Sequence, residues 1–156
     1  MSTELSSTTS LSRPSGSSLP ASRLTQARPT HSRPRLMLID DNDAFLSAMK
    51  LLLPRLFDIE IIASVQSGQD ALDRLKDIDV DLMIADYKMP GLNGLTFARR
   101  ARENRIWTRI LLVTFNPDPA LEECARDCGA DGVINKADIQ TDLQHYLPRW
   151  FGCKMH

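Results

Sequence analysis

The sequence of 156 residues has no apolar run that approaches the roughly 20 residues required to cross a bilayer, so we expect no membrane span. Cysteine is also scarce. Cys124, Cys128 and Cys153 form an odd, sparse set that cannot supply the framework of a disulfide-rich secreted domain. This usage favours a reducing, cytoplasmic location.

Net positive charge is confined to the N-terminal region. Residues 1–34 carry four arginines against one glutamate, a net charge of +3. Because the whole chain carries −1, the remaining residues carry −4. A nucleic-acid-binding surface would show a clustered basic face, so we expect no nucleic-acid partner.

Large apolar residues are nearly absent from residues 1–34, which are dominated by Ser, Thr, Pro and Arg. Such a segment cannot bury enough surface to offset the entropy of ordering, and we predict a disordered tail. Its composition also resembles that of a transit peptide, although four prolines would interrupt any amphipathic helix. Residues 35–156 are sufficient for one folded domain.

Five short runs of aliphatic and β-branched residues follow, each too short for a helix. They predict strands at residues 36–39, 59–63, 80–85, 110–113 and 133–134. The second run contains Glu60, so we expect it at an edge of the sheet.

Between these runs, apolar residues recur at the spacing of amphipathic helices. The first predicted helix buries a stripe of Phe45, Ala48, Met49, Leu52 and Leu56. Other stripes predict helices near residues 71–75, 95–101, 121–128 and 143–147, the last ended or kinked by Pro148. Alternating strands and helices predict the α/β class, with a parallel sheet covered on both faces.

Polar residues follow four of the predicted strands: Asp40 and Asp41, then Asp86, Thr114 and Lys136. Each has an ordinary explanation when taken alone, such as a helix cap, a turn, a strand end or a solvated charge. A parallel sheet, however, brings the carboxyl ends of its strands to one edge, where ligands bind. We therefore consider these residues as one candidate site.

Three crowded carboxylates repel one another, and either a raised pKa or a bound cation relieves that repulsion. Oxygen ligands completed by water suit Mg²⁺. A lysine and a hydroxyl beside such an ion can hold a phosphoryl group. The hypothesis is that Asp86 is a nucleophile that forms an acyl phosphate.

These residues lie in longer motifs that resemble a known family. The sequence reads Leu-Ile-Asp-Asp-Asn over 38–42, Asp-Tyr-Lys-Met-Pro-Gly-Leu-Asn-Gly over 86–94, Val-Thr over 113–114 and Gly-Ala-Asp-Gly-Val-Ile-Asn-Lys over 129–136. Residues 35–147 thus resemble the receiver domain of bacterial two-component response regulators. The resemblance implies a doubly wound, five-stranded parallel sheet, the flavodoxin-like receiver fold.

The resemblance also implies a role for each site residue. Asp86 is the phosphoacceptor, and Thr114 and Lys136 hold the phosphoryl oxygens. Asp41 ligates Mg²⁺ directly, Asp40 acts on it mainly through water, and the backbone carbonyl of Lys88 supplies another ligand.

The function implied is that of a signalling switch rather than an enzyme. A histidine kinase or a histidine phosphotransfer protein donates the phosphoryl group, and the phosphorylated form engages an unknown downstream protein or passes the group onward. A transient dimer is a further option. The motif spacing is closest to receivers that precede a helix-turn-helix domain, and we expect no such output domain in this chain.

Three departures from the family pattern concern the readout of phosphorylation. Val133 replaces a common aromatic switch residue, Phe115 replaces a small residue after Thr114, and Ala137 replaces a proline that forms a cis peptide. An alternative is therefore a receiver-like interaction domain that no longer switches. An aspartyl hydrolase, a third hypothesis, would need a second aspartate where Lys88 stands.

Several other residues have two interpretations. The Phe115 ring either narrows the phosphoryl pocket, which would prolong the life of the acyl phosphate, or turns outward toward a partner. Cys124 and Cys128 fit core packing better than a zinc site. Trp150 and Phe151 either close the core or contact a partner.

Overall fold

The computed structural model describes residues 33–156. Nearly all of the predicted tail thus lies outside the described residues, and its disorder stays a prediction. Arg33 and Pro34 are described. The Arg33 Nε atom lies 2.8 Å from Asp58 Oδ1, and the Pro34 carbonyl accepts a hydrogen bond from the Glu60 N–H at 2.9 Å. Both residues therefore contact the folded unit immediately before its first strand.

Five parallel strands form one sheet in the order β2-β1-β3-β4-β5, which is a doubly wound order. Their bounds are Arg35–Ile39 for β1, Glu60–Val65 for β2, Leu82–Asp86 for β3, Arg109–Thr114 for β4 and Gly132–Asn135 for β5. The prediction of an α/β fold with a five-stranded parallel sheet is confirmed, as is the edge position of the second strand.

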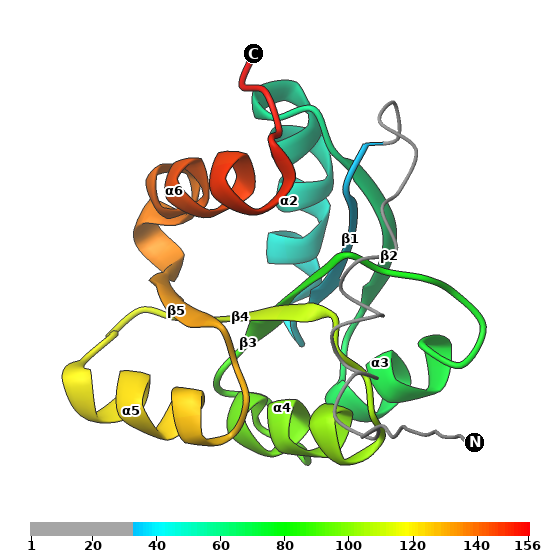
Figure 1. Cartoon of the computed structure of the whole chain (residues 1–156), viewed down its shortest axis with the longest axis vertical. Helices are drawn as coiled ribbons and strands as arrows, with labels where there is room; N and C mark the ends of the chain where they lie inside the picture. The colour runs from blue at the N-terminus through cyan, green and yellow to red at the C-terminus, as the bar shows by residue number, and fades with distance from the viewer. Residues whose placement is uncertain (1–32) are drawn as a thin grey trace, which may run out of the picture. The chain divides into compact units, whose positions relative to one another are not determined.

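Helices cover both faces of this sheet. Figure 1 shows α2 (Asp43–Leu56) and α6 (Ile139–Phe151) on one face, and α3 (Gly68–Arg74), α4 (Gly94–Glu103) and α5 (Pro119–Asp127) on the other. A short 3-10 helix, η1 (Lys136–Asp138), joins β5 to α6. Among residues 33–156, no helix has the length and apolarity to cross a membrane.

The strands are buried on both faces, which explains their continuous apolar sequences. In β1, Leu36 and Leu38 pack in the core beneath α2 and α6, whereas Met37 and Ile39 pack in the core beneath α3, α4 and α5. Both layers around the strands are apolar. The polar residues lie where the strands end, along the carboxyl-terminal edge of the sheet.

Short polar side chains begin the helices that leave this edge. Asn42 Oδ1 accepts a hydrogen bond from the Phe45 N–H, and Asn93 Oδ1 accepts one from the Thr96 N–H. Asp118 caps α5 in the same way. These caps satisfy backbone donors that the first helical turn leaves unpaired. The start of each helix is thereby fixed close to the strand ends.

The buried stripe of α2 differs from the predicted one. Leu46, Met49 and Leu53 face the core, whereas Ala48 and Leu52 are exposed. The helix contains apolar residues on more than one face, so more than one stripe satisfies the helical period. Packing against the sheet selects the stripe one residue away from that prediction.

Two further expectations are wrong in part. Helix α6 does not end at Pro148 but continues to Phe151, where Gly152 caps it with a φ of 62°. Pro148 is exposed, so the carbonyl that loses its intrahelical partner can bind water. Cys124 is exposed rather than buried, although Cys128 lies in the core as expected.

Candidate functional site

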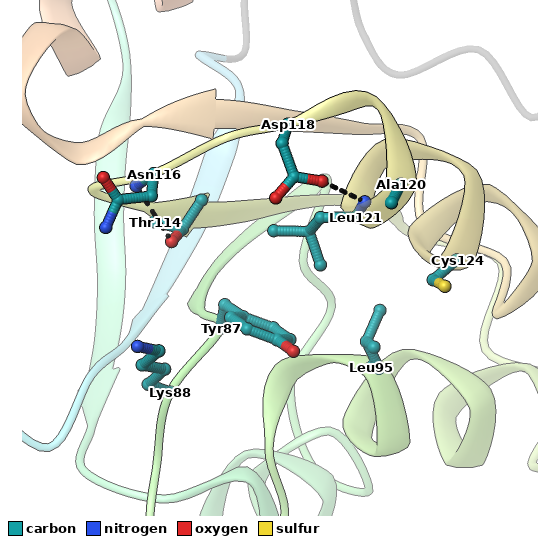
Figure 2. Close-up of a pocket in the computed structure, with 9 residues that line it drawn as sticks. All are labelled: Tyr87, Lys88, Leu95, Thr114, Asn116, Asp118, Ala120, Leu121 and Cys124. Carbon is teal, nitrogen blue, oxygen red and sulfur yellow. Dashed lines mark hydrogen bonds between the residues drawn. The ribbon is translucent and has the colours of Figure 1, made fainter.

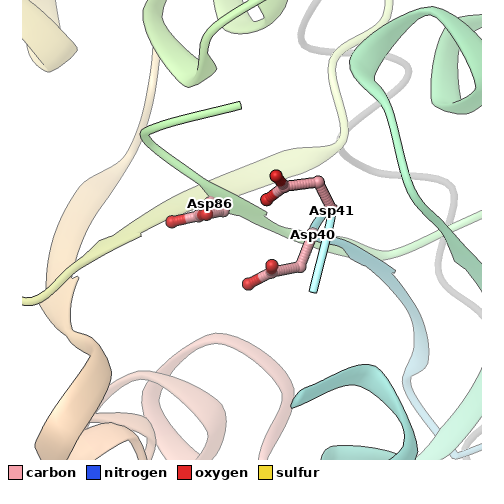
Figure 3. Close-up of side chains that lie close together, drawn as sticks. All are labelled: Asp40, Asp41 and Asp86. Carbon is pink, nitrogen blue, oxygen red and sulfur yellow. The ribbon is translucent and has the colours of Figure 1, made fainter. Parts of the chain in front are cut away.

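The register of the central strands brings the acidic residues together. Ile39 of β1 pairs with Ala85 of β3, so Asp40 and Asp86 follow the two strands side by side. Carboxylate oxygens of Asp40, Asp41 and Asp86 all lie within 4.8 Å of one another. Figure 3 shows the three side chains grouped at the strand ends. The three carboxylates predicted from the sequence thus form one cluster.

Burial makes it unfavourable for all three carboxylates of this cluster to be ionised. Asp40 and Asp86 are buried, whereas Asp41 is exposed. Desolvation by burial raises the pKa of Asp86 above its ordinary value of 3.8; the charge of Asp40 raises it further, while Lys136 opposes both effects. The ionised form of Asp86 is therefore disfavoured unless a cation lies nearby.

Lys136 supplies one positive charge to the cluster. Its Nζ atom lies 2.6 Å from Asp40 Oδ2 and 3.6 Å from Asp86 Oδ2, and its side chain is 8% exposed. The short contact to Asp40 is an ion pair without hydrogen-bond alignment, because Oδ2 of Asp40 has no hydrogen-bond partner within the described chain. The other oxygen, Oδ1, accepts a hydrogen bond from the Asn42 N–H at 2.8 Å.

Thr114 lies at the end of β4, next to β5, the strand that Lys136 directly follows. It is buried and pairs in register with Asn135, the residue before Lys136. Its Oγ1 accepts a hydrogen bond from the Asn116 N–H at 3.3 Å. A pocket of about 170 Å³ opens here, lined by Asp86, Lys88, Thr114, Phe115, Asn116 and Lys136. The predicted nucleophile, hydroxyl and ammonium therefore share one small cavity.

The loop after Asp86 is held by backbone contacts and by two glycines. The Tyr87 N–H donates to Val113 O at 2.8 Å, and the Gly94 N–H donates to Tyr87 O at 2.9 Å. A Cβ atom on Gly94 would lie 2.9 Å from the Asp86 carbonyl oxygen, too close for another residue. Gly91 has a φ of 77°, a conformation that favours glycine. The D-x-x-M-P-G-x-x-G spacing thus fixes the backbone around Asp86.

The donor set fits Mg²⁺. Three carboxylates offer clustered oxygens, and one buried oxygen, Asp40 Oδ2, lacks a directional partner in the described chain. An ion of this kind takes oxygen ligands and keeps several waters, which suits a cluster whose third member, Asp41, is exposed. Lys88 lines the same pocket as Asp86.

The three departures from the family pattern have clear positions. Val133 is half-buried beside Leu112. Phe115 is 64% exposed and nevertheless lines the pocket beside Asp86. The Lys136–Ala137 peptide bond is trans, and the Ala137 N–H donates to Asn135 Oδ1 at 2.9 Å. A side-chain hydrogen bond thus shapes the loop where a proline is usual.

A second pocket, of about 370 Å³, shares Lys88, Thr114 and Asn116 with the pocket beside Asp86. Figure 2 shows the Tyr87 ring in this pocket, together with Leu95 of α4 and Leu121 of α5. The aromatic ring nearest in sequence to Asp86 therefore lies on the α4 and α5 side of the sheet.

Sequence reasoning missed one neighbour of the site. Phe45 was expected only as a core residue of its helix, but its ring centroid lies 4.4 Å from Lys136 Nζ. The sequence did offer one indication of this contact. Phe45 lies in the first turn of a helix that begins at the carboxyl-terminal edge of the sheet, four residues after Asp41.

The raised pKa of Asp86 leads to a stability prediction. In buffer without divalent cations at pH 7, Asp86→Asn should raise the free energy of unfolding by about 1 kcal/mol, because it removes a disfavoured buried charge. The wild type should gain stability as pH falls through the raised pKa toward 3.8, since the folded state binds the proton more tightly. Urea denaturation of both proteins from pH 7 to pH 4 measures the difference.

Magnesium should reverse the order of stability, so that the wild type has the larger free energy of unfolding. At about 100 times its Kd, Mg²⁺ should stabilise the wild type by ~2.7 kcal/mol and the variant by much less, since one ligand is lost. Equal stabilisation of the wild type and Asp86→Asn would show that Asp86 is not a ligand.

The chain is similar to known proteins in sequence and in fold. The family model of the response regulator receiver domain matches residues 36–147. The two-component response regulator ARR13 of Arabidopsis thaliana is 34% identical over 111 residues, which cover 69% of this chain and 19% of that protein. The nitrate/nitrite response regulator NarL of Escherichia coli strain K12 is 29% identical over 108 residues, 69% of this chain and 50% of NarL.

Among solved structures, the receiver domain of NarL from Mycobacterium tuberculosis superposes with a TM-score of 0.65 at 26% identity. The match covers 78% of this chain and 98% of that one. The chain spans about half the length, or less, of the curated relatives it matches. These relatives come from a plant and from bacteria, so a bacterial origin stays a prediction. The fold, the strand-end cluster and the match over residues 36–147 together show that the chain belongs to the response regulator receiver domain family.

Proposed function

We propose that this chain is a phosphoacceptor switch of a two-component phosphorelay and that Asp86 receives the phosphoryl group. One observation carries the proposal: the clustered carboxylates of Asp40, Asp41 and Asp86 lie beside the Lys136 ammonium at the edge of the sheet where Thr114 ends its strand. Phosphoryl transfer depends chiefly on positioning and charge neutralisation, and this arrangement offers both.

The reaction forms one bond and breaks one. A carboxylate oxygen of Asp86 attacks phosphorus, and the bond between phosphorus and the donor breaks. The leaving group, a histidine nitrogen of a kinase or of a phosphotransfer protein, takes the electron pair and is protonated from solvent. Burial of Asp86 limits its solvation, so the carboxylate meets the donor without a full hydration shell.

Lys136 and Thr114 would hold the transferred group. The Lys136 ammonium, 3.6 Å from Asp86 Oδ2, would pair with one phosphoryl oxygen, and the Thr114 hydroxyl in the same pocket would donate a hydrogen bond to another. Asp41, Asp86 and the Lys88 carbonyl are the proposed direct ligands of Mg²⁺, and Asp40 would act on the ion mainly through water. The ion would supply charge neutralisation at the carboxylates and the phosphoryl oxygens.

The proposed partners are proteins. A histidine kinase or histidine phosphotransfer protein donates the group, and a downstream protein or a second copy recognises the phosphorylated edge. The chain would act as a signalling phosphoacceptor rather than as an enzyme with turnover, in the cytoplasm, without contacting nucleic acid itself.

Intact-mass spectrometry with a small phosphodonor tests this proposal. The wild type should gain one phosphoryl group in Mg²⁺, and none after chelation of the metal. Asp86→Asn should gain none, while Asp138→Asn, which changes an exposed carboxylate, should behave as the wild type. Modification of the wild type and Asp86→Asn to the same extent would refute the assignment. An unmodified wild type would favour a receiver-like interaction domain that does not switch.

Phe115 should lengthen the life of the acyl phosphate. Its ring lines the mouth of the phosphoryl pocket, where it narrows the path of the water that must align behind phosphorus. Phe115→Ala should speed dephosphorylation of the purified phosphoprotein by about three- to tenfold, a barrier change of roughly 1 kcal/mol. An unchanged rate accompanied by loss of partner binding would instead support a ring that serves an outward contact.

A further inference from the structure

The ammonium of Lys136 has an unusual set of neighbours. Asp40 and Asp86 contribute carboxylates, and two phenyl rings contribute their faces. The Phe45 ring centroid, from the first turn of α2, lies 4.4 Å from Nζ. The Phe115 ring centroid, from the loop after β4, lies 5.5 Å from Nζ. Two anions and two rings therefore share one ammonium.

A lysine in this position needs such neighbours to stay in place. Its charge lies at the end of a flexible four-carbon stem, and the contact with Asp40 has no hydrogen-bond alignment. An aromatic ring attracts an ammonium through its quadrupole, and more strongly where water is excluded. The side chain is 8% exposed, so water is largely excluded here.

We propose that Phe45 and Phe115 are positioning residues that hold the Lys136 ammonium over Asp86. This inference rests on the proposed function, because the position matters when Lys136 pairs with the incoming phosphoryl group. Phe45 is the stronger of the two, since its ring is closer and half-buried. The Phe115 ring is more distant and 64% exposed, and it makes the smaller contribution.

The aromatic face of Phe45, rather than its apolar bulk, should hold the Lys136 ammonium in position. Phe45 also packs against the core beneath α2 and α6, so a leucine there keeps most of the packing but loses the ring face. A tyrosine keeps the ring face. Phe45→Leu and Phe45→Tyr therefore separate positioning of the ammonium from packing of the helix.

The first measurement is the rate of phosphorylation by a small phosphodonor in saturating Mg²⁺. Phe45→Leu should react about three- to tenfold more slowly than the wild type, and Phe45→Tyr should react within about twofold of it. Phe115→Leu, at an exposed position that folding does not require, should slow the reaction about twofold. Wild-type rates for Phe45→Leu and Phe115→Leu would overturn the inference.

The second measurement is independent of phosphorylation. In protein with labelled lysine, the εCH₂ proton resonance of Lys136, identified by its loss in Lys136→Arg, should be shifted upfield by the rings. The shift should shrink in Phe45→Leu and persist in Phe45→Tyr. A Lys136 resonance at the position of the exposed lysines would also overturn the inference. A shifted resonance in a wild type that cannot be phosphorylated would count against the proposed function while supporting the contact between the rings and the ammonium.

Discussion

Replacing Lys136 with alanine should slow phosphorylation of Asp86 by about 100-fold in saturating Mg²⁺, as expected when a preorganised group that stabilises developing charge is removed. The Nζ atom of Lys136 lies within 3.6 Å of Asp86 Oδ2 and is shielded from water. A charge in such a site acts more strongly than one in solvent. Stopped-flow or quenched mass spectrometry with a small phosphodonor measures the rate.

Lys88→Ala is the matched control. Lys88 lines the same pocket, but its side chain is exposed, and the substitution leaves the backbone carbonyl in place. Its rate should stay within about threefold of the wild type, because solvent screens an exposed charge. Similar rates for Lys136→Ala and the wild type would remove Lys136 from the proposed mechanism.

The second large effect concerns stability rather than chemistry. Arg102 of α4 donates hydrogen bonds to the carbonyls of Gly129, Ile106 and Thr108 at 2.9, 2.6 and 2.7 Å, and pairs with Asp131 at 3.2 Å. Arg102→Ala would leave all four acceptors without this donor. We expect a loss of about 3 kcal/mol in the free energy of unfolding, measured by urea denaturation.

The control for this prediction is Arg100→Ala. Arg100 lies two residues earlier on the same helix and is exposed, so its removal should change the free energy of unfolding by no more than about 0.5 kcal/mol. A similarly small effect of Arg102→Ala would mean that water replaces the guanidinium without cost. That outcome would contradict the role assigned to Arg102 in joining α4 to the segments before β4 and β5.

The sequence was sufficient to predict the strand-end residues because their positions follow from a parallel sheet. Once Ile39 and Ala85 are in register, Asp40 and Asp86 must lie together. In the same way, Lys136 must lie near Thr114, because Asn135 pairs with Thr114. Strand ends depend on topology alone, and the apolar runs specify that topology well.

Helix faces and side-chain contacts were harder to predict. In α2 the apolar residues permit several stripes, and only packing against the sheet places Leu46 inside and Leu52 outside. The contact between Phe45 and Lys136 joins residues that are far apart in the sequence, and no periodicity in the sequence predicts it. The effect of Pro148 on its helix likewise depends on context. Proline has no N–H to donate, and water can take its place where the unpaired carbonyl is exposed.

The location of the phosphoryl group tests the central claim most directly. The protein would be phosphorylated by a small phosphodonor in Mg²⁺, reduced with borohydride, digested and sequenced by tandem mass spectrometry. Reduction converts an acyl phosphate on aspartate into homoserine. The account predicts homoserine in place of Asp86 in the peptide that contains Tyr87 and Lys88. Homoserine in place of Asp40 or Asp41, with Asp86 unchanged, would contradict it.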